Sequence, residues 1–403
     1  MLHIGILREE KIPHDTRVAL SPDQCKELIQ SGRANITIQP SDERCFSNAA
    51  YLEAGANISE DLGACDFLMG VKEIPVPFLK ENTTYFIFSH TIKQQAHNRP
   101  LLQAMLQKNN RLVDYEVLVN DKNQRLIAFG RFAGKVGAHN ALYTYGKRTG
   151  KFTLPRMKDL TDYAAALEIY KQTTFPKMKI VLTGTGRVSG GSVKVLDDMG
   201  IRKVSPEAFL NEEFDTAVYT QLSSKHYVKR KDGKPFENTE FYAFPADFES
   251  AFSPYAAVSD IFINGIYWDN DAPAFFTVAE MCEKNFKIEV IADITCDIAP
   301  QSSVPSTIRA STILAPVYGF DPFLEKESAP YQLNNIDIMA IDNLPNELPR
   351  DASVAFGEQF ISSVLPEIEK GWGSKVIARA TICENGQLTP YFEYLQDYVN
   401  QLV

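Results

Sequence analysis

The feature that most constrains the fold of this chain is a glycine-rich turn between an apolar run and a helical pattern. The run Lys179–Thr183 leads directly into Gly184-Thr185-Gly186-Arg187-Val188-Ser189-Gly190-Gly191. Glycines at a strand-to-helix turn let the backbone approach a pyrophosphate, which then lies at the positively polarised helix N-terminus. Ser189 stands at the third position of the usual fingerprint, so a plain turn without a ligand is the alternative. We predict a βαβ unit here that holds a dinucleotide.

Alternating strand and helix patterns extend to both sides of this turn. Strand-like runs lie at 3–7, 35–39, 67–71, 84–88, 260–267, 288–294 and 312–317, and a helical pattern lies at 99–108. Alternation of this kind predicts α/β layers around mostly parallel sheets. Residues 130–154 are rich in Gly and Lys, 157–172 predict a connecting helix, and the regular pattern breaks over 205–257.

The amino-acid composition of the chain limits the kinds of molecule that it is expected to bind. The 403 residues suggest roughly two or three domains. With 41 basic and 51 acidic side chains, the net charge of −10 argues against a general binder of nucleic acid or anionic membranes. The first ten residues lack a long apolar stretch, and no run approaches the roughly 18 apolar residues of a membrane span. We expect a cytoplasmic monomer or homodimer whose partners are small molecules.

The region after the glycine turn bears on the choice of cofactor. An acidic residue about 20 positions on would accept a hydrogen bond from the ribose 2′-hydroxyl of NAD. That region reads Lys203-Val204-Ser205-Pro206, and four cations follow at Lys225, Lys229, Arg230 and Lys231. These cations favour NADP(H), with NAD(H) as the other choice. A solvated loop explains any single one of them equally well.

Two neighbouring strand ends carry groups suited to proton transfer. Lys72 and Glu73 follow the run that begins at Phe67, and His90 follows the run at 84–88. Because sites gather at the carboxyl ends of strands in open α/β sheets, the lysine and the histidine are predicted to face one cleft. Position alone leaves a surface lysine and a satisfied core histidine as the alternative.

Other charged residues also follow apolar runs, and cations among them suit carboxylates, which arginine binds bidentately. They are Arg17, Lys93, Glu116 and Arg131. For each of these four residues taken alone, a surface ion pair is the alternative to a substrate-binding role. Asp342 ends another apolar run, and for it the alternative is that an aspartate initiates a turn. Asp293 and Asp297 flank residues 294–296, but six scattered cysteines and the lack of histidine after His226 predict no metal site and no disulfides.

Six stretches, in order along the chain, carry a resemblance to a known family. They are GVKE at 70–73, FSHT at 88–91, LIAFGRFAG at 126–134, LTGTGRVS at 182–189, FINGIYW at 262–268 and IDNLPNELP at 341–349. At these residues the chain resembles the lysine–2-oxoglutarate reductase family, the lysine-forming saccharopine dehydrogenases. These belong to the wider alanine dehydrogenase and transhydrogenase superfamily, and the resemblance runs from Ile4 to about Gly373.

The resemblance implies an α/β fold of two Rossmann-like domains with a cleft between them and a C-terminal segment that returns to the first domain. Residues 1–150 and 343–403 would form the substrate domain, and residues 151–342 the dinucleotide-binding domain. Lys72 and His90 would be the acid–base pair. The implied substrate-binding residues are Arg17, Glu73, Lys93, Glu116, Arg131 and Asp342. The predicted cofactor-binding residues are Gly184, Gly186, Arg187, Val188, Ser189, Lys225 and Asp293.

The implied reaction joins the ε-amine of L-lysine to the carbonyl of 2-oxoglutarate. Water leaves to give an imine, which hydride from NAD(P)H reduces to saccharopine. Lys72 would have to lose its proton near neutral pH, so we predict a depressed pKa for it. The 225–252 segment resembles the family only loosely. An alanine dehydrogenase-like enzyme, another opine-forming reductase and a catalytically silent nucleotide sensor therefore stay open as alternatives.

Overall fold

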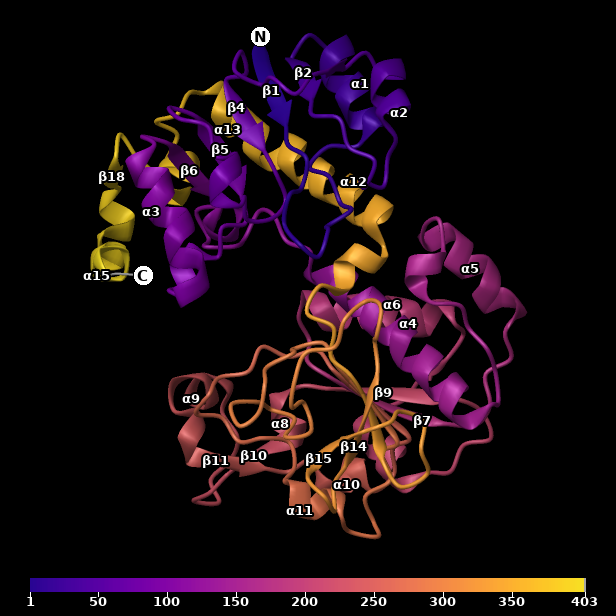
Figure 1. The fold of residues 1–403 in the computed structure, drawn as a ribbon. Helices are drawn as coiled ribbons and strands as arrows, with labels where there is room; N and C mark the ends of the chain where they lie inside the picture. The colour runs from indigo at the N-terminus through magenta and orange to yellow at the C-terminus, as the bar shows by residue number, and fades with distance from the viewer. Residues whose placement is uncertain (402–403) are drawn as a thin grey trace. The chain divides into compact units, whose positions relative to one another are not determined.

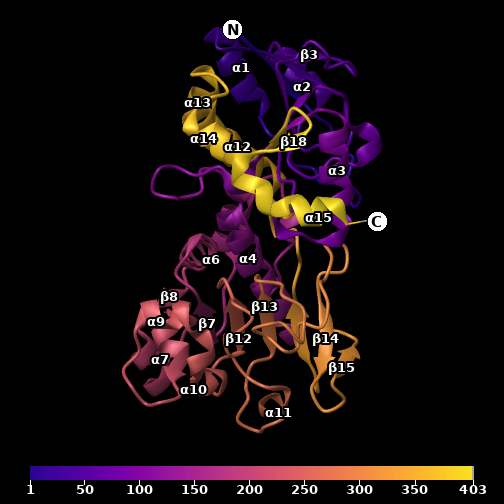
Figure 2. The ribbon, with the colours of Figure 1, turned by 90° about the vertical axis from the view of Figure 1, so that its left-hand side faces the viewer.

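The computed structural model describes residues 1–401 and divides the chain into two compact units. Unit 1 contains Met1–Phe129 together with the tail that starts at Pro349, and unit 2 contains Gly130–Leu348 (Figure 1). Residues 402 and 403, which end the predicted first domain, lie outside the described residues. The tail elements, coloured yellow, lie among the elements of unit 1 in both ribbon views (Figure 2).

Unit 1 is built on one eight-stranded sheet. In spatial order its strands are β18 (Gln387–Leu388), β17 (Thr381–Glu384), β6 (Arg111–Asp114), β5 (Thr84–Ile87), β4 (Phe67–Met69), β1 (Leu2–Ile6), β2 (Ala34–Ile38) and β3 (Asn57–Ile58). The six strands from β6 to β3 are parallel, and the two tail strands add antiparallel pairs at one edge.

The helices of unit 1 come from both ends of its sequence. They are α1 (Pro22–Gln30), α2 (Asn48–Glu53), α3 (Arg99–Gln107), α12 (Pro349–Gln359), α13 (Leu365–Glu369), α14 (Lys375–Ala380) and α15 (Gln396–Asn400). Phe356 and Phe360 of the tail are fully buried in one core with Ile4 and Phe67 of the sheet. This core is what holds the tail on unit 1, because burial of large aromatic side chains is the main favourable contribution to packing.

Unit 2 contains a second eight-stranded sheet. Its order is β15 (Lys326–Ser328), β14 (Tyr318–Asp321), β16 (Ile336–Met339), β13 (Val290–Asp293), β12 (Ile261–Asn264), β7 (Lys179–Thr183), β9 (Val218–Leu222) and β8 (Arg202–Lys203). The strands from β16 to β8 are parallel, whereas β14 and β15 are antiparallel. The predicted α/β fold class with mostly parallel sheets is therefore confirmed.

The helices of unit 2 are α4 (Gly130–Thr149), α5 (Tyr163–Gln172), α6 (Arg187–Asp198), α7 (Pro206–Asn211), α8 (Ser224–Tyr227), α9 (Asn238–Ala243), α10 (Ser253–Ala256) and α11 (Val278–Met281). Most of the stretch 130–154, which is rich in Gly and Lys, forms the long helix α4, and α4 packs against α6. A Cβ at Gly134 would lie 1.8 Å from the Val188 carbonyl oxygen, and one at Gly191 would lie 2.0 Å from that of Arg131. The two backbones touch, so glycine is required on both helices.

Helix α4 explains where the units divide. The sequence placed the boundaries of the first domain after residue 150 and before residue 343, whereas the structure divides the chain after Phe129 and before Pro349. Because α4 packs on α6 and on the second sheet, it belongs to unit 2. The connecting helix expected at 157–172 begins only at Tyr163, behind the short 3₁₀ turn Met157–Asp159.

Two sequence expectations fail in unit 2. The strand expected at 312–317 is wrong, because the chain there is irregular and the strand, β14, begins at Tyr318. The segment 205–257 is more regular than expected: it contains β9 in the sheet and a hairpin of β10 (Val228–Arg230) with β11 (Phe248–Ser250). The aromatic residues Phe241, Phe248 and Phe252 of this segment are buried in one core with sheet residues such as Val181 and Phe262.

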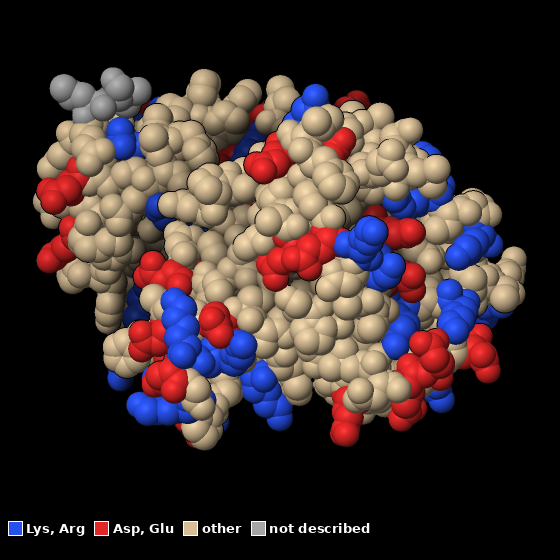
Figure 3. Space-filling view, turned by 90° about the horizontal axis from the view of Figure 1, so that it is seen from below, with Lys and Arg blue, Asp and Glu red and all other residues tan. Residues whose placement is uncertain are grey.

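The surface carries charges of both signs. On the face shown in Figure 3, basic and acidic side chains are interspersed. No helix within residues 1–401 is both long and apolar enough to cross a membrane.

Candidate active site

Four neighbouring strands of unit 1 bring the predicted polar residues to one edge of the sheet. Strands β1, β4, β5 and β6 are adjacent and parallel, so their carboxyl ends lie together. Lys72 and Glu73 follow β4, His90 follows β5, and Glu116 lies in the 3₁₀ turn that follows β6. Lys72 and His90 therefore follow the ends of two adjacent parallel strands, as predicted.

His90 is held through one ring nitrogen. Its Nδ1 is hydrogen-bonded to Oε1 of Glu73, and Oε2 of Glu73 accepts a hydrogen bond from Lys11 Nζ at 2.8 Å. Burial opposes ionisation of Glu73, but the bonds from His90 and Lys11 outweigh it and lower the Glu73 pKa to about 2. With Nδ1 bound to a carboxylate, Nε2 is the ring nitrogen placed to exchange a proton with a ligand.

Lys72 has the depressed pKa that the sequence predicted. Burial of its ammonium group lowers the pKa most, and the nearby Arg17 guanidinium lowers it further. The charges of Asp15 and Glu73 act in the opposite direction but do not compensate. The side chain thus needs less free energy than an exposed lysine to lose its proton, which is what a general base near neutral pH requires.

Glu9 is a residue of this edge that the sequence reasoning missed. Its Oε1 accepts a hydrogen bond from the backbone N–H of Val71 at 2.5 Å, and its Oε2 accepts one from Lys72 N–H at 2.9 Å. Burial, followed by the charge of Asp15, raises the pKa of Glu9 to about 8. The only signal in the sequence is an acidic pair directly after the first strand, at residues 9 and 10.

Arg17 is buried, with 3 % of its surface exposed. Its Nε and one terminal nitrogen bind the Asp15 carboxylate at 2.9 and 2.5 Å, and its guanidinium lies 4.2 Å from the centre of the Phe129 ring. The geometry gives it a positioning contact and an electrostatic effect on Lys72. Its binding of a substrate carboxylate stays a prediction.

Glu116 lies among cations. Its Oε1 is 3.7 Å from Lys93 Nζ and 3.8 Å from a terminal nitrogen of Arg125, which the sequence reasoning did not single out. Its Oε2 is buried without a hydrogen-bond partner among the described residues. An unsatisfied buried carboxylate oxygen is costly, so a bound ligand with a hydrogen-bond donor would relieve it.

The remaining two predicted substrate residues belong to unit 2. Arg131 is exposed in the first turn of α4, and Asp342 is exposed after β16. The structure does not group either of them with the residues at the strand ends of unit 1. Their substrate role stays a prediction.

The glycine turn of unit 2 has the shape that its sequence predicted. Gly184 has φ +98°, and a Cβ there would lie 2.4 Å from Ser189 Oγ and 2.7 Å from the Gly265 carbonyl oxygen. Gly186 caps the twelve-residue helix α6, and a Cβ on it would meet no described atom within 4 Å. Ser189 replaces the third glycine because its Oγ lies 3.0 Å from the carbonyl oxygens of both Thr183 and Gly265, where it can donate.

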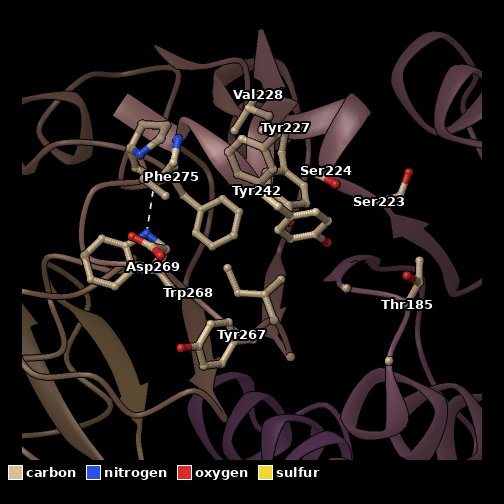
Figure 4. A pocket seen from close by; sticks show the side chains of 18 residues that line it. Thr185, Ser223, Ser224, Tyr227, Val228, Tyr242, Tyr267, Trp268, Asp269 and Phe275 are labelled. Atoms are coloured by element: carbon tan, nitrogen blue, oxygen red, sulfur yellow. Dashed lines mark hydrogen bonds between the residues drawn. The ribbon is translucent and has the colours of Figure 1, made fainter. Parts of the chain in front are cut away.

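A cavity of about 370 Å³ opens beside this turn, within the usual size range of small-molecule sites. It is bordered by the chain that leaves β7, β9 and β12 and by the aromatic 224–245 segment. Figure 4 shows the rings of Tyr227, Tyr242 and Tyr267 around it, with Thr185 of the glycine turn on one side. Open backbone next to flat apolar rings suits a phosphate joined to a heteroaromatic base.

Of the four cations that the sequence proposed for a 2′-phosphate, three are engaged elsewhere. Lys229 pairs with Glu249, Arg230 pairs with Asp232 and Glu240, and Lys231 Nζ donates to the Ala246 carbonyl oxygen. Lys225 is exposed and forms no ion pair with any described residue. It directly follows Ser224, which borders the cavity.

Asp293, expected at the cofactor, is fully buried at the end of β13. Its Oδ1 accepts a hydrogen bond from Asn264 at 2.9 Å, and its Oδ2 accepts one from Thr307 at 2.7 Å. Burial raises its pKa to about 6. Contact with a cofactor stays a prediction, because both oxygens already have partners. In residues 1–401 no cluster of three His, Cys, Asp or Glu side chains is arranged to hold a metal ion.

Comparison with known proteins agrees with this arrangement. Residues 5–136 match the family model of the alanine dehydrogenase/PNT N-terminal domain. Over 98 % of its length the chain is 30 % identical to alpha-aminoadipic semialdehyde synthase of Rattus norvegicus, of which it covers 47 %. Over 89 % of its length it is 26 % identical to the lysine-forming saccharopine dehydrogenase of Emericella nidulans, of which it covers 90 %.

Solved structures give the same fold. An L-alanine dehydrogenase superposes with a TM-score of 0.66 at 14 % identity, covering 99 % of this chain and all of that one. The transhydrogenase from Sinorhizobium meliloti gives a TM-score of 0.57 at 12 % identity, covering 96 % and 99 %.

Residues 5–136 thus resemble the alanine dehydrogenase/PNT N-terminal domain, and most of the chain is similar to the lysine-forming saccharopine dehydrogenases.

The chain spans less than half the length of the alpha-aminoadipic semialdehyde synthases of Arabidopsis thaliana and Rattus norvegicus that it matches, namely 41 % and 47 %. It covers 90 % of the Emericella nidulans saccharopine dehydrogenase. An architecture of two Rossmann-like units is what the chain shares with the two solved structures.

Proposed function

We propose that this chain is a nicotinamide-dependent oxidoreductase that interconverts L-lysine plus 2-oxoglutarate and saccharopine. The observation that carries the proposal is the pair of proton-transfer groups at adjacent strand ends. Lys72 has a lowered pKa, and His90 is fixed by Glu73 through Nδ1. The names of the full-length relatives support this substrate class.

The reaction needs two positions for protons. The carbinolamine oxygen must be protonated to leave as water, and the amine nitrogen must release or regain a proton as the carbon is reduced or oxidised. We assign these two positions to the Nζ of Lys72 and the Nε2 of His90, and each such group typically contributes about 10²–10⁴-fold. The cations Lys93 and Arg125 would attract the substrate carboxylates.

The glycine turn fits a dinucleotide. The backbone is bare at Gly186, which leaves room for a pyrophosphate at the N-terminus of α6, and the aromatic-lined cavity beside it has room for an adenosine. A bound nicotinamide dinucleotide would supply or accept the hydride. Gly184, Gly186, Arg187, Val188 and Ser189 would hold it through the backbone of the turn.

The order of strands supports NADP(H) over NAD(H). Strand β9 lies between β7 and β8, so the residue level with Gly184 is Ser223 and not the end of β8. The Gly184 N–H donates to the Leu222 carbonyl oxygen at 2.8 Å, which fixes this register. Residues 216–231 contain no acid that would accept a bond from a ribose 2′-hydroxyl, whereas Lys225 offers a positive charge for a 2′-phosphate.

A substrate panel tests the proposal. Oxidation of NADPH and of NADH would be followed with 2-oxoglutarate plus L-lysine and, separately, with pyruvate plus ammonium. We expect turnover only with the lysine pair, and faster with NADPH. Turnover only with pyruvate plus ammonium would replace the proposal by an alanine dehydrogenase-like activity. Tight nucleotide binding without turnover of any pair would replace it by nucleotide sensing.

A further inference from the structure

The Glu9 carboxylate reaches across the first sheet from one strand end to the next. It leaves the chain after β1 and binds two successive backbone N–H groups, those of Val71 and Lys72, after β4. Each carboxylate oxygen has one of these donors, so the bond pair fixes both the position and the direction of the turn.

The turn that Glu9 holds carries two groups of the proposed chemistry. Lys72 is one of them, and the next residue, Glu73, holds His90 through Nδ1. Glu9 and Glu73 also border one small cavity of about 30 Å³. Movement of this turn would therefore displace Lys72 directly and His90 through Glu73.

The neighbouring Glu10 offers a contrast. Glu10 has the same chemistry one residue on, but its carboxylate pairs with the Arg8 guanidinium at 2.7 Å. Two adjacent glutamates thus serve different purposes: one stabilises a local ion pair, and the other binds the backbone of a neighbouring strand end.

We infer that Glu9 is the positioning residue of the acid–base pair, and that it keeps Lys72 half-buried by holding the Val71–Lys72 backbone. This inference rests on the proposed roles of Lys72 and His90. Burial is the largest cause of the lowered Lys72 pKa. Loss of the two Glu9 bonds lets water reach Lys72, weakens that effect and returns its ammonium group towards ordinary behaviour.

The test compares Glu9→Gln with Glu10→Gln in the full chain. Acylation of each lysine by a small anhydride, read by mass spectrometry across pH, gives the midpoint at which Lys72 becomes reactive without any substrate or cofactor. In Glu9→Gln this midpoint moves up towards that of the exposed Lys229, and kcat falls roughly 10- to 100-fold, while the KM for nucleotide stays the same. Glu10→Gln leaves all three values at those of the wild type.

A second variant guards against misfolding. Glu9→Asp keeps the carboxylate but is one methylene too short to reach both N–H groups, so it shifts the midpoint in the same direction. An unchanged or lowered Lys72 midpoint in a folded Glu9 variant overturns the inference. A raised midpoint in a protein that turns over no lysine pair leaves the positioning role standing and rejects the proposed function instead.

Discussion

The two units use the same part of the same architecture in opposite ways. In unit 1 the carboxyl ends of parallel strands carry charged side chains that hold one another, such as Glu73 with His90 and Lys11. In unit 2 the chain that leaves β7, β9 and β12 begins with Gly184, Ser223 and Gly265, and the room left beside these residues is lined by aromatic rings. The first edge presents side-chain functional groups, whereas the second presents bare backbone.

This difference shows how one sheet topology supports two kinds of site. Proton transfer needs groups whose pKa values are displaced, and unit 1 supplies burial and neighbouring charges for that purpose. A dinucleotide needs backbone N–H groups and flat surfaces, and side chains at the turn would obstruct it. Substitutions in the two units should therefore separate chemistry from nucleotide binding.

The largest effect is expected at Lys72. Lys72→Met removes a proton-transfer group, so kcat/KM should fall about 10²–10⁴-fold. The dissociation constant of the nucleotide, measured by calorimetry, should not change, because the glycine turn is in unit 2. Substitution of an exposed lysine of the same unit, Lys26→Met, is the control and should retain wild-type rates. Equal losses of rate and of nucleotide affinity would contradict the separation of the two sites.

The second prediction concerns pH. The folded-state pKa of Glu73 is about 2, below the ordinary value of 4.5, so its ionised form stabilises the fold above about pH 4.5, and this stabilisation is lost as the pH falls towards about 2. The difference amounts to about 3 kcal/mol at most. Glu73→Gln should flatten the fall in the free energy of unfolding over this range, measured with urea. Parallel curves for the two proteins would show that the Glu73 carboxylate does not have this role.

A smaller effect is expected at the glycine turn. Gly186→Val fills the space where the pyrophosphate would lie and should weaken binding of ADP roughly 10- to 100-fold, the range for loss of a bond to a charged group. A Cβ at Gly190 also meets open space, one helical turn on, so Gly190→Val is the matched control. Calorimetry measures the affinities, and thermal melting checks that both variants fold. Equal affinities for the two variants would place the nucleotide elsewhere.

The smallest effect is expected from Lys225. Lys225→Ser should weaken binding of 2′,5′-ADP about tenfold, because one charge-assisted contact is lost, and should leave 5′-ADP unaffected. Lys229→Ser is the control, since Lys229 already pairs with Glu249. A wild-type protein that binds 5′-ADP more tightly than 2′,5′-ADP would reverse the proposed preference and favour NAD(H).

The local features of the sequence predicted their own structure well. Strand β7 and the turn that follows it lie at the residues predicted for them, because the sequence signals of the strand, the glycine turn and the helix are adjacent in the chain. Lys72 and His90 come from neighbouring strands, and a parallel α/β sheet made that expectation possible. The lowered pKa of Lys72 followed from the chemistry that the resemblance implies.

Features that depend on distant residues were not predictable. Glu9 contacts a backbone 62 residues away, and an acidic residue after a strand has many other uses. Strand β9 is five residues long within an irregular aromatic segment, so its insertion beside β7 was missed although Val218-Tyr219-Thr220 favours a strand. The end of β8 is therefore not the position at which an acidic residue would meet the ribose, because β9 and not β8 lies next to β7.

The interrupted course of unit 1 sets an order of assembly during synthesis. Unit 2 is one continuous segment that ends at Leu348, so all of its strands have emerged before the tail is translated. Unit 1 lacks Phe356 and Phe360 of its core and its edge strand β17 until residues beyond 380 leave the ribosome. Unit 2 is therefore able to fold first, while the core beneath the charged strand ends of unit 1 is completed only by the tail that starts at Pro349.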